Sequence, residues 1–158
     1  MISAVRAANV ILGHAAQDGE PLTPLQVMKL VYMSHGVNLA KFDAPLIPDP
    51  VQAWQYGPVV SSLYGAMKHF GNRPIHPPKL TTTMFDRSEP SDGDLWALGA
   101  VYKAYGKLTG PALSNLTHRP GSPWSRIWRP GVSNLVIPNE LIAQHYKEAR
   151  AKGVLDAA

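Results

Sequence analysis

The chain has 158 residues, which suits one domain with a substantial core and is short for two, so we expect a single domain over residues 1–158. Hydrophobic residues make up 45% of the sequence, but no apolar run approaches the ~18 residues that span a bilayer, and Met1 to Ala16 lacks the apolar block of a signal peptide. The absence of cysteine excludes disulfides, thiolate zinc sites and cysteine nucleophiles, and with no targeting segment we expect a cytoplasmic protein.

The net charge of +4 is unevenly distributed along the chain. Three cations and no acid lie between Lys68 and Lys79, and five cations and no acid lie between Lys103 and Arg129. This asymmetry indicates a basic face that steers an acidic partner, either a protein or a nucleic acid. A solvated basic surface without a partner explains the same pattern equally well.

Two helical patterns open the chain. Apolar residues recur at helical spacing from Ser3 to Gln17, and Thr23-Pro24-Leu25-Gln26 combines an N-cap, a first-turn proline and a capping box. The helix that follows, Leu25 to about Lys41, is apolar on nearly all sides and is therefore expected to be the buried central helix. We interpret His35, near its middle, as a hydrogen-bonded core residue rather than a ligand.

The next regular segment joins a predicted strand to a predicted helix. Val51 to Tyr56 favours a strand, in which alternation places Gln52, Trp54 and Tyr56 on one side and Val51, Ala53 and Gln55 on the other. Gly57 then permits a turn, and Pro58 suits the first position of a helix that continues to Phe70. The residues that we interpret as structural here are Trp54, Tyr56, Gly57 and Pro58.

Four further segments complete the predicted fold. The proline-rich stretch from Asn72 to Pro90 is expected to be a long surface excursion, mobile or functional, with one short extended piece at Ile75 or Leu80 to Met84. The predicted helices after it run from Asp92, as N-cap, to Leu108, from Thr109 to His118, from Ser122 to Trp128, and from Pro138 to about Lys152, with Leu155 to Ala158 frayed. The fold class is therefore mainly α: a compact single-domain helical bundle of six or seven helices with one or two short strands, nominally α+β.

Motifs for catalysis or metal binding are missing from the sequence. No two of the six histidines have the spacing of a zinc site, and no phosphate-binding loop or nucleophile elbow is present, so we expect no metal, no cofactor and no enzyme. Thr117-His118 ahead of Ser122 and Trp124 could pass for a site with His118 as a base. In the alternative interpretation, Thr117 and Trp124 are structural. Thr and Ser then cap helices, and His118 bonds a loop carbonyl.

Several motifs together resemble the Panacea domain, the SocA-like antitoxin family. The resemblance covers about residues 4 to 150, and it departs from the family at Met28, where members often carry a polar residue, and in the long excursion. The segments that carry it are Thr23-Pro24-Leu25-Gln26, Lys29-Leu30-Val31-Tyr32, His35-Gly36, Pro45-Leu46, Ala53-Trp54-Gln55-Tyr56-Gly57-Pro58-Val59-Val60, Tyr64, Phe70-Gly71, Leu116-Thr117-His118 and Pro123-Trp124.

The resemblance implies an antitoxin of a bacterial toxin–antitoxin system that neutralises a co-encoded toxin by binding it. Some members of the family resemble adaptors that deliver the toxin to an ATP-dependent protease such as ClpXP. The alternative hypothesis is a DNA-binding transcriptional regulator that uses the basic face. The sequence lacks a polar, basic recognition helix of the kind that a helix-turn-helix needs, so nucleic acid is not the expected partner.

Interfaces are rich in aromatic residues and arginine, and charge steers association, so we expect partner contacts near the acid-free basic segments. One exposed edge lies on the helix after Pro58, and a second forms if the Ser122 to Trp128 helix folds back against the strand–helix joint. The alternatives are that these residues only solvate the surface, or that the excursion binds the partner. The expected partner-binding residues are Tyr64, Lys68, Arg73, His118, Arg119, Arg126 and Arg129.

Overall fold

The computed structural model describes residues 1–152 and contains, within them, seven α-helices, one short 3₁₀ helix and a small three-stranded sheet. This confirms the mainly α fold class with a few short strands. The helices are α1 (Ala4–Gln17), α2 (Pro24–Phe42), α3 (Ser61–Met67), η1 (Lys68–Phe70), α4 (Asp92–Tyr105), α5 (Gly110–His118), α6 (Pro123–Ile127) and α7 (Asn139–Ala151). The strands are β1 (Val51–Trp54), β2 (Gly57–Val59) and β3 (Leu135–Ile137).

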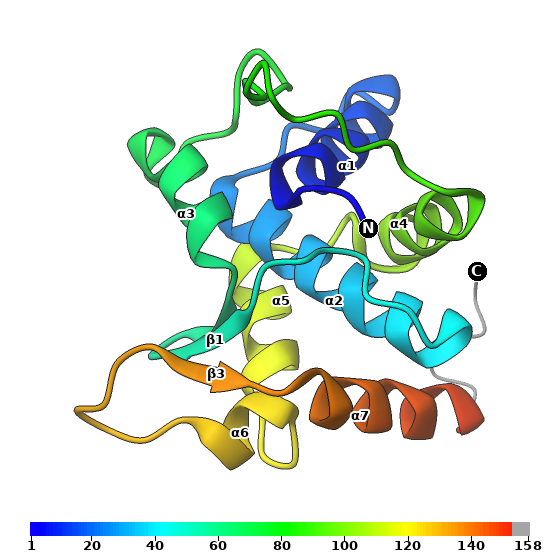
Figure 1. Cartoon of the computed structure of the whole chain (residues 1–158). Coiled ribbons are helices and arrows are strands. Elements are labelled where there is room, and N and C mark those ends of the chain that lie inside the picture. The colour runs from blue at the N-terminus through cyan, green and yellow to red at the C-terminus, as the bar shows by residue number, and fades with distance from the viewer. Residues whose placement is uncertain (153–158) are drawn as a thin grey trace.

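Helix α2 is the central element, as its apolar sequence predicts. Every residue from Val27 to Leu39 is buried, and α1, α4, α5 and α7 pack around this helix (Figure 1). Its start is fixed by the expected capping box, in which the Thr23 hydroxyl accepts from the Gln26 amide and the Gln26 side chain accepts from the Thr23 amide. It ends where Asp43 adopts a left-handed conformation, with φ of 51°.

His35 links α2 to two other parts of the core. Its Nδ1 accepts from the Leu46 amide at 3.2 Å, so Nε2 carries the proton and donates to Asn139 Oδ1 at 2.9 Å. Burial lowers the pKa of this imidazole despite the bond to Asn139. The prediction of a hydrogen-bonded core histidine is confirmed.

The strand–helix joint differs from the prediction. The chain forms a hairpin: β1 pairs antiparallel with β2, with Trp54 opposite Gly57 and Ala53 opposite Pro58, and β3 pairs with the other edge of β1. Pro58 was expected at the first helical position, and this is wrong, because Gly57, with φ of +116°, turns the chain back along β1. A proline without an N–H is tolerated because β2 is an edge strand, and α3 begins only at Ser61.

The alternation predicted for the strand holds over its shorter observed length. Val51 and Ala53 are buried, whereas Gln52 and Trp54 are half-buried on the other face. Strand β3 was not predicted, although Leu135-Val136-Ile137 is a short apolar run.

The excursion before α4 contains no helix or strand from Asn72 to Pro90, so neither Ile75 nor Leu80 to Met84 forms a strand, yet the segment is tied to the body. Leu80 and Asn9 form a reciprocal pair, in which the Asn9 amide donates to the Leu80 carbonyl at 2.9 Å and accepts from its N–H at 2.7 Å. Asp86 accepts from the Ser3 hydroxyl and lies 3.3 Å from Arg6 Nε. These bonds, together with the Ser88 hydroxyl, lower the pKa of Asp86 to about 2.

The helix after the excursion starts with a different cap from the one expected. Ser91, not Asp92, is the N-cap of α4, and its hydroxyl accepts from the Asp94 amide at 3.1 Å. Ser91 is favoured at the N-cap position because Asp94 completes a capping box by accepting from the Ser91 amide at 3.0 Å. The helix also ends at Tyr105, earlier than predicted.

Candidate functional site

A groove of about 450 Å³ opens between the start of α2, the β1–β2 hairpin and α3. Its volume falls within the range of about 300–1,000 Å³ that is usual for binding pockets. Its surface is predominantly apolar. The side chains that dominate it are Leu25, Met28, Trp54, Tyr56, Tyr64 and Met67.

Large hydrophobic side chains stand exposed around this groove. Tyr56 is 69% exposed, Tyr64 is 46% exposed and Leu25 is 38% exposed. The Tyr64 ring meets the Trp54 ring edge-on, with 5.0 Å between centroids, which fixes both rings at the mouth. Clustered exposed aromatic residues at a hollow are typical of protein–protein interfaces.

The groove also carries an exposed cation, Lys68. Among the described residues that line it there are two lysines, Lys29 and Lys68, and no acidic residue. Lys29 is 1% exposed, and its Nζ donates to the Pro58 carbonyl at 2.9 Å, which holds β2 against α2. Because this ammonium is buried, its pKa falls to about 7. The ion pairs within residues 1–152 involve Arg6 and Lys147, so none of them neutralises Lys29.

A second hollow of about 730 Å³ lies on the other side of the hairpin tip. It shares Trp54 and Gln55 with the groove and is completed by Trp128 and the loop from Pro130 to Asn134. Trp124 Nε1 donates to the Trp54 carbonyl at 2.5 Å, and the Trp124 and Trp128 rings stack with 5.0 Å between centroids. Helix α6 therefore folds back against the hairpin.

Ser114 of α5 bonds the hairpin, and Thr117 and His118 bond their own helix. The Ser114 hydroxyl donates to the Tyr56 carbonyl at 2.8 Å, and the Thr117 hydroxyl bonds the carbonyls of Leu113 and Ser114 at 3.0 and 3.1 Å. His118 Nδ1 contacts the Ser114 carbonyl, so this nitrogen carries the proton and is not a base toward the nearby hydroxyl. His118 therefore bonds a carbonyl of its own helix, not a loop carbonyl.

Comparison with known proteins identifies the family. The sequence model described as "Antitoxin SocA-like, Panacea domain" matches residues 27–125, a span that includes the hairpin, most of the groove and the start of α6. The chain belongs to this family.

A named relative agrees with this membership. Antitoxin SocA of Caulobacter vibrioides (strain NA1000 / CB15N) is 30% identical to the chain over 132 residues, which cover 80% of this chain and 70% of that protein. No solved structure matches. Membership of the SocA-like family supports an antitoxin role for this protein. Within residues 1–152, no helix is long and apolar enough to cross a membrane.

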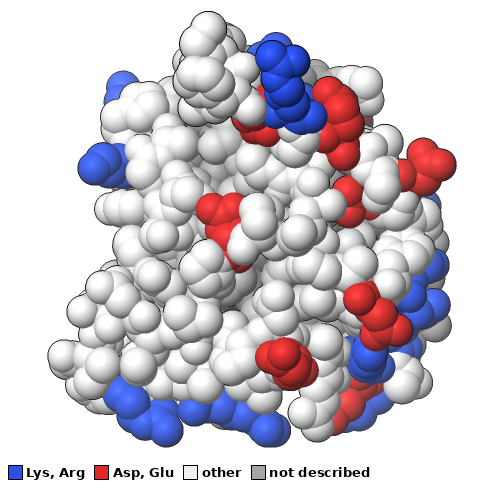
Figure 2. All heavy atoms as spheres, viewed as in Figure 1, with Lys and Arg blue, Asp and Glu red and all other residues white. Residues whose placement is uncertain are grey.

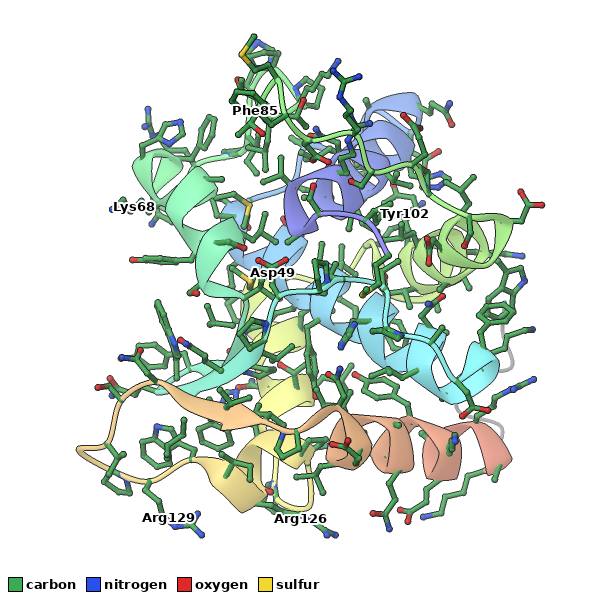
Figure 3. All side chains as sticks on the ribbon, viewed as in Figure 1. Asp49, Lys68, Phe85, Tyr102, Arg126 and Arg129 are labelled. Atoms are coloured by element: carbon green, nitrogen blue, oxygen red, sulfur yellow. The ribbon has the colours of Figure 1, made fainter. Side chains whose placement is uncertain are left out.

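The structure of this Panacea-domain protein separates the predicted partner-binding residues into groups. Tyr64 on α3 and Lys68 at the start of η1 are both exposed and line the groove. Arg73 is exposed just after η1, where its guanidinium donates to the carbonyls of His69 and Phe70 at 3.1 and 3.2 Å. Arg126, on α6, and Arg129, just after it, lie at the lower edge of the molecule, away from Lys68 (Figure 3).

The cations therefore do not form one continuous patch on the face in view. Figure 2 shows Lys and Arg side chains at separate edges of this face, with mostly uncharged surface between them. Arg119 is exposed at the end of α5, and His118 is half-buried against the Trp124 ring, with 5.3 Å between centroids. Tyr56, expected to be structural, instead projects from the hairpin tip.

Several groove residues were not predicted as site residues. Leu25 and Met28 were expected only as apolar residues of the buried central helix, and Lys29 was not singled out. A signal for Lys29 exists in the sequence, because it is a lone cation in the interior of a helix that is otherwise apolar over most of its length. The position of the groove depends on the hairpin, whose first strand was predicted but whose second strand, β2, was expected to be the start of a helix.

Proposed function

We propose that this protein is an antitoxin that neutralises a co-encoded toxin by binding it directly. The observation that carries the proposal is that the family's motif residues Trp54 and Tyr56, with Tyr64, build an open apolar groove on the surface. An exposed aromatic groove next to a cation has the composition of a protein-binding surface, with aromatic anchors that supply affinity and a charge that steers association.

The proposed neutralisation requires no catalysis by this chain. The hydroxyls of Ser114 and Thr117 are bonded to backbone carbonyls, and the protonated His118 Nδ1 faces a carbonyl. Ser114 ties the hairpin to α5, and Thr117 and His118 bond carbonyls of their own helix, so the three are not arranged as a nucleophile and base. Binding alone is the simplest function that this arrangement supports.

Delivery of the toxin to an ATP-dependent protease such as ClpXP is the second part of the proposal. In this mode the toxin lies in the groove while another surface of the antitoxin contacts the protease. In cells that lack the protease, a purely blocking antitoxin still protects, whereas an adaptor fails and the toxin accumulates. The toxin's half-life with and without the antitoxin, in both backgrounds, separates the two modes.

The experiment that tests direct neutralisation is co-expression with the small protein encoded by the adjacent gene. Growth should be restored when both are present, and the two should co-purify. Absence of both effects would overturn the proposal. A DNA-binding regulator is the alternative outcome, and a salt-dependent shift of upstream DNA by the purified protein alone would favour it.

A further inference from the structure

The free edge of the sheet beside the groove is closed to strand addition. Pro58 is the middle residue of the edge strand β2; it has no N–H, and its carbonyl already accepts from Lys29 at 2.9 Å. A strand added at this edge would find neither a donor nor a free acceptor at that position. A partner must therefore dock through its side chains.

The composition of the groove restricts the partner's backbone as well. An extended segment lying in it would leave its own N–H and C=O groups facing Met28, Trp54 and Met67. Trp54 Nε1 already donates to Gln52 Oε1 at 2.9 Å, Met28 Sδ already accepts from the Val60 N–H at 3.3 Å, and Met67 offers only a weak sulfur acceptor. A helix satisfies these groups internally and presents only side chains. The exposed Lys68, with no acid among the described lining residues, favours a partner that carries a carboxylate.

We infer that the groove binds one amphipathic helix of the toxin, with the helix's apolar face against Trp54, Tyr64 and Met67 and an acidic residue facing Lys68. This inference rests on the proposed function. Lys68 is exposed at the end of α3 and so reaches a carboxylate on the solvent side of the bound helix.

Two pairs of variants test the surface, each with a matched control. Tyr64→Ala removes an aromatic ring that is 46% exposed and edge-on to Trp54; Phe42→Ala removes one that is 41% exposed and edge-on to Trp96, outside the groove. Lys68→Glu reverses a charge at the groove, and Lys103→Glu reverses one on α4. The dissociation constant for the adjacent gene's toxin should rise about tenfold or more for the groove variants and less than about twofold for the controls.

The shape of the partner segment is tested by cross-linking. A photoreactive amino acid at position 64 should cross-link to one segment of the toxin. A proline in the middle of that segment should abolish binding of the toxin, whereas an alanine on its polar face should not. An acidic-to-lysine change in the same segment should restore binding to the Lys68→Glu variant.

The outcomes separate the inference from the function on which it rests. If the wild-type protein does not bind the toxin, the proposed function fails. If the wild type binds and the groove variants behave like their controls, the toxin binds elsewhere and the groove inference is overturned. A small molecule retained by the wild-type protein in native mass spectrometry, lost on Tyr64→Ala while toxin binding is unchanged, would also overturn it.

Discussion

Lys29 places an ammonium group in the core, where its only hydrogen bond in the described structure is to the Pro58 carbonyl. The bond has a structural role because it ties the edge strand to the central helix. It also makes stability depend on pH, since the pKa of Lys29 is about 7 in the folded protein and ordinarily 10.5.

The sign of that dependence follows from proton binding. Between the two pKa values the unfolded chain holds a proton on Lys29 that the folded protein has released, so the free energy of unfolding rises with pH. Below the folded pKa both states are protonated and the Lys29 contribution is flat. Burial lowers the pKa of His35, so its contribution is lost as pH falls below 6.5, outside this window.

We predict that chemical denaturation of the wild type shows increasing stability from pH 7.5 to pH 9.5, by at most about 1.4 kcal/mol per pH unit. Above about pH 10 the rise should stop, because unfolded tyrosines then ionise while burial keeps the pKa of Tyr32 and Tyr146 raised. Lys29→Met should remove the slope whatever it does to absolute stability. A slope that persists in this variant would assign the effect to another group.

At the scale of elements, the packing of α2 against α7 depends on a single glycine. A Cβ built on Gly36 would lie 2.3 Å from Tyr146 Cδ2, so the helices can approach only because this position lacks a side chain. Gly13, exposed on α1, has no atom within 4 Å of its built Cβ and makes a matched control.

We predict that Gly36→Ala lowers the free energy of unfolding by roughly 1–3 kcal/mol through overpacking. Gly13→Ala should raise it by roughly 0.5–1 kcal/mol, since alanine has the higher helix propensity. Thermal melts of the two variants under the same conditions check both signs. Equal effects at the two sites would show that helix propensity, not contact with Tyr146, decides the outcome.

The excursion is held by the Asn9–Leu80 pair, which no local pattern in the sequence reveals. We predict that Asn9→Ala speeds amide hydrogen exchange at Leu80 by about tenfold or more, because it leaves the backbone of a buried residue without its partners. Asn115→Ala, exposed on α5, is the control. Unchanged protection at Leu80 would mean that the burial of its side chain alone anchors the segment.

The helices and strands differ in how well they could be predicted from the sequence. Capping boxes and apolar periodicity predicted α2 and the other long helices closely, because those signals are local. The hairpin was misread because Gly57 and Pro58 fit a helix start as well as a turn into an edge strand, and pairing with Val51 to Trp54 decides between them. Three-residue strands such as β3 carry too little pattern to be separated from a loop.

For the whole molecule, the candidate site was predictable only in part. Tyr64 and Lys68 follow from helical spacing on an amphipathic segment, and the structure places both at the groove. The expectation that all basic segments share one face required tertiary information, and the structure instead separates Lys68 from Arg126 and Arg129 (Figure 3). The groove exists because α2, the hairpin and α3 meet, which no single segment encodes.

The most direct test of the account is a calorimetric titration of the purified full-length protein with the purified toxin of the adjacent gene. We predict a saturable complex of fixed stoichiometry, with loss of toxin activity at the same ratio. The dissociation constant of the Lys68→Glu variant should be higher than that of Lys103→Glu by about tenfold or more. Neutralisation without a complex, or no neutralisation at saturating antitoxin, would contradict direct binding as the function of this protein.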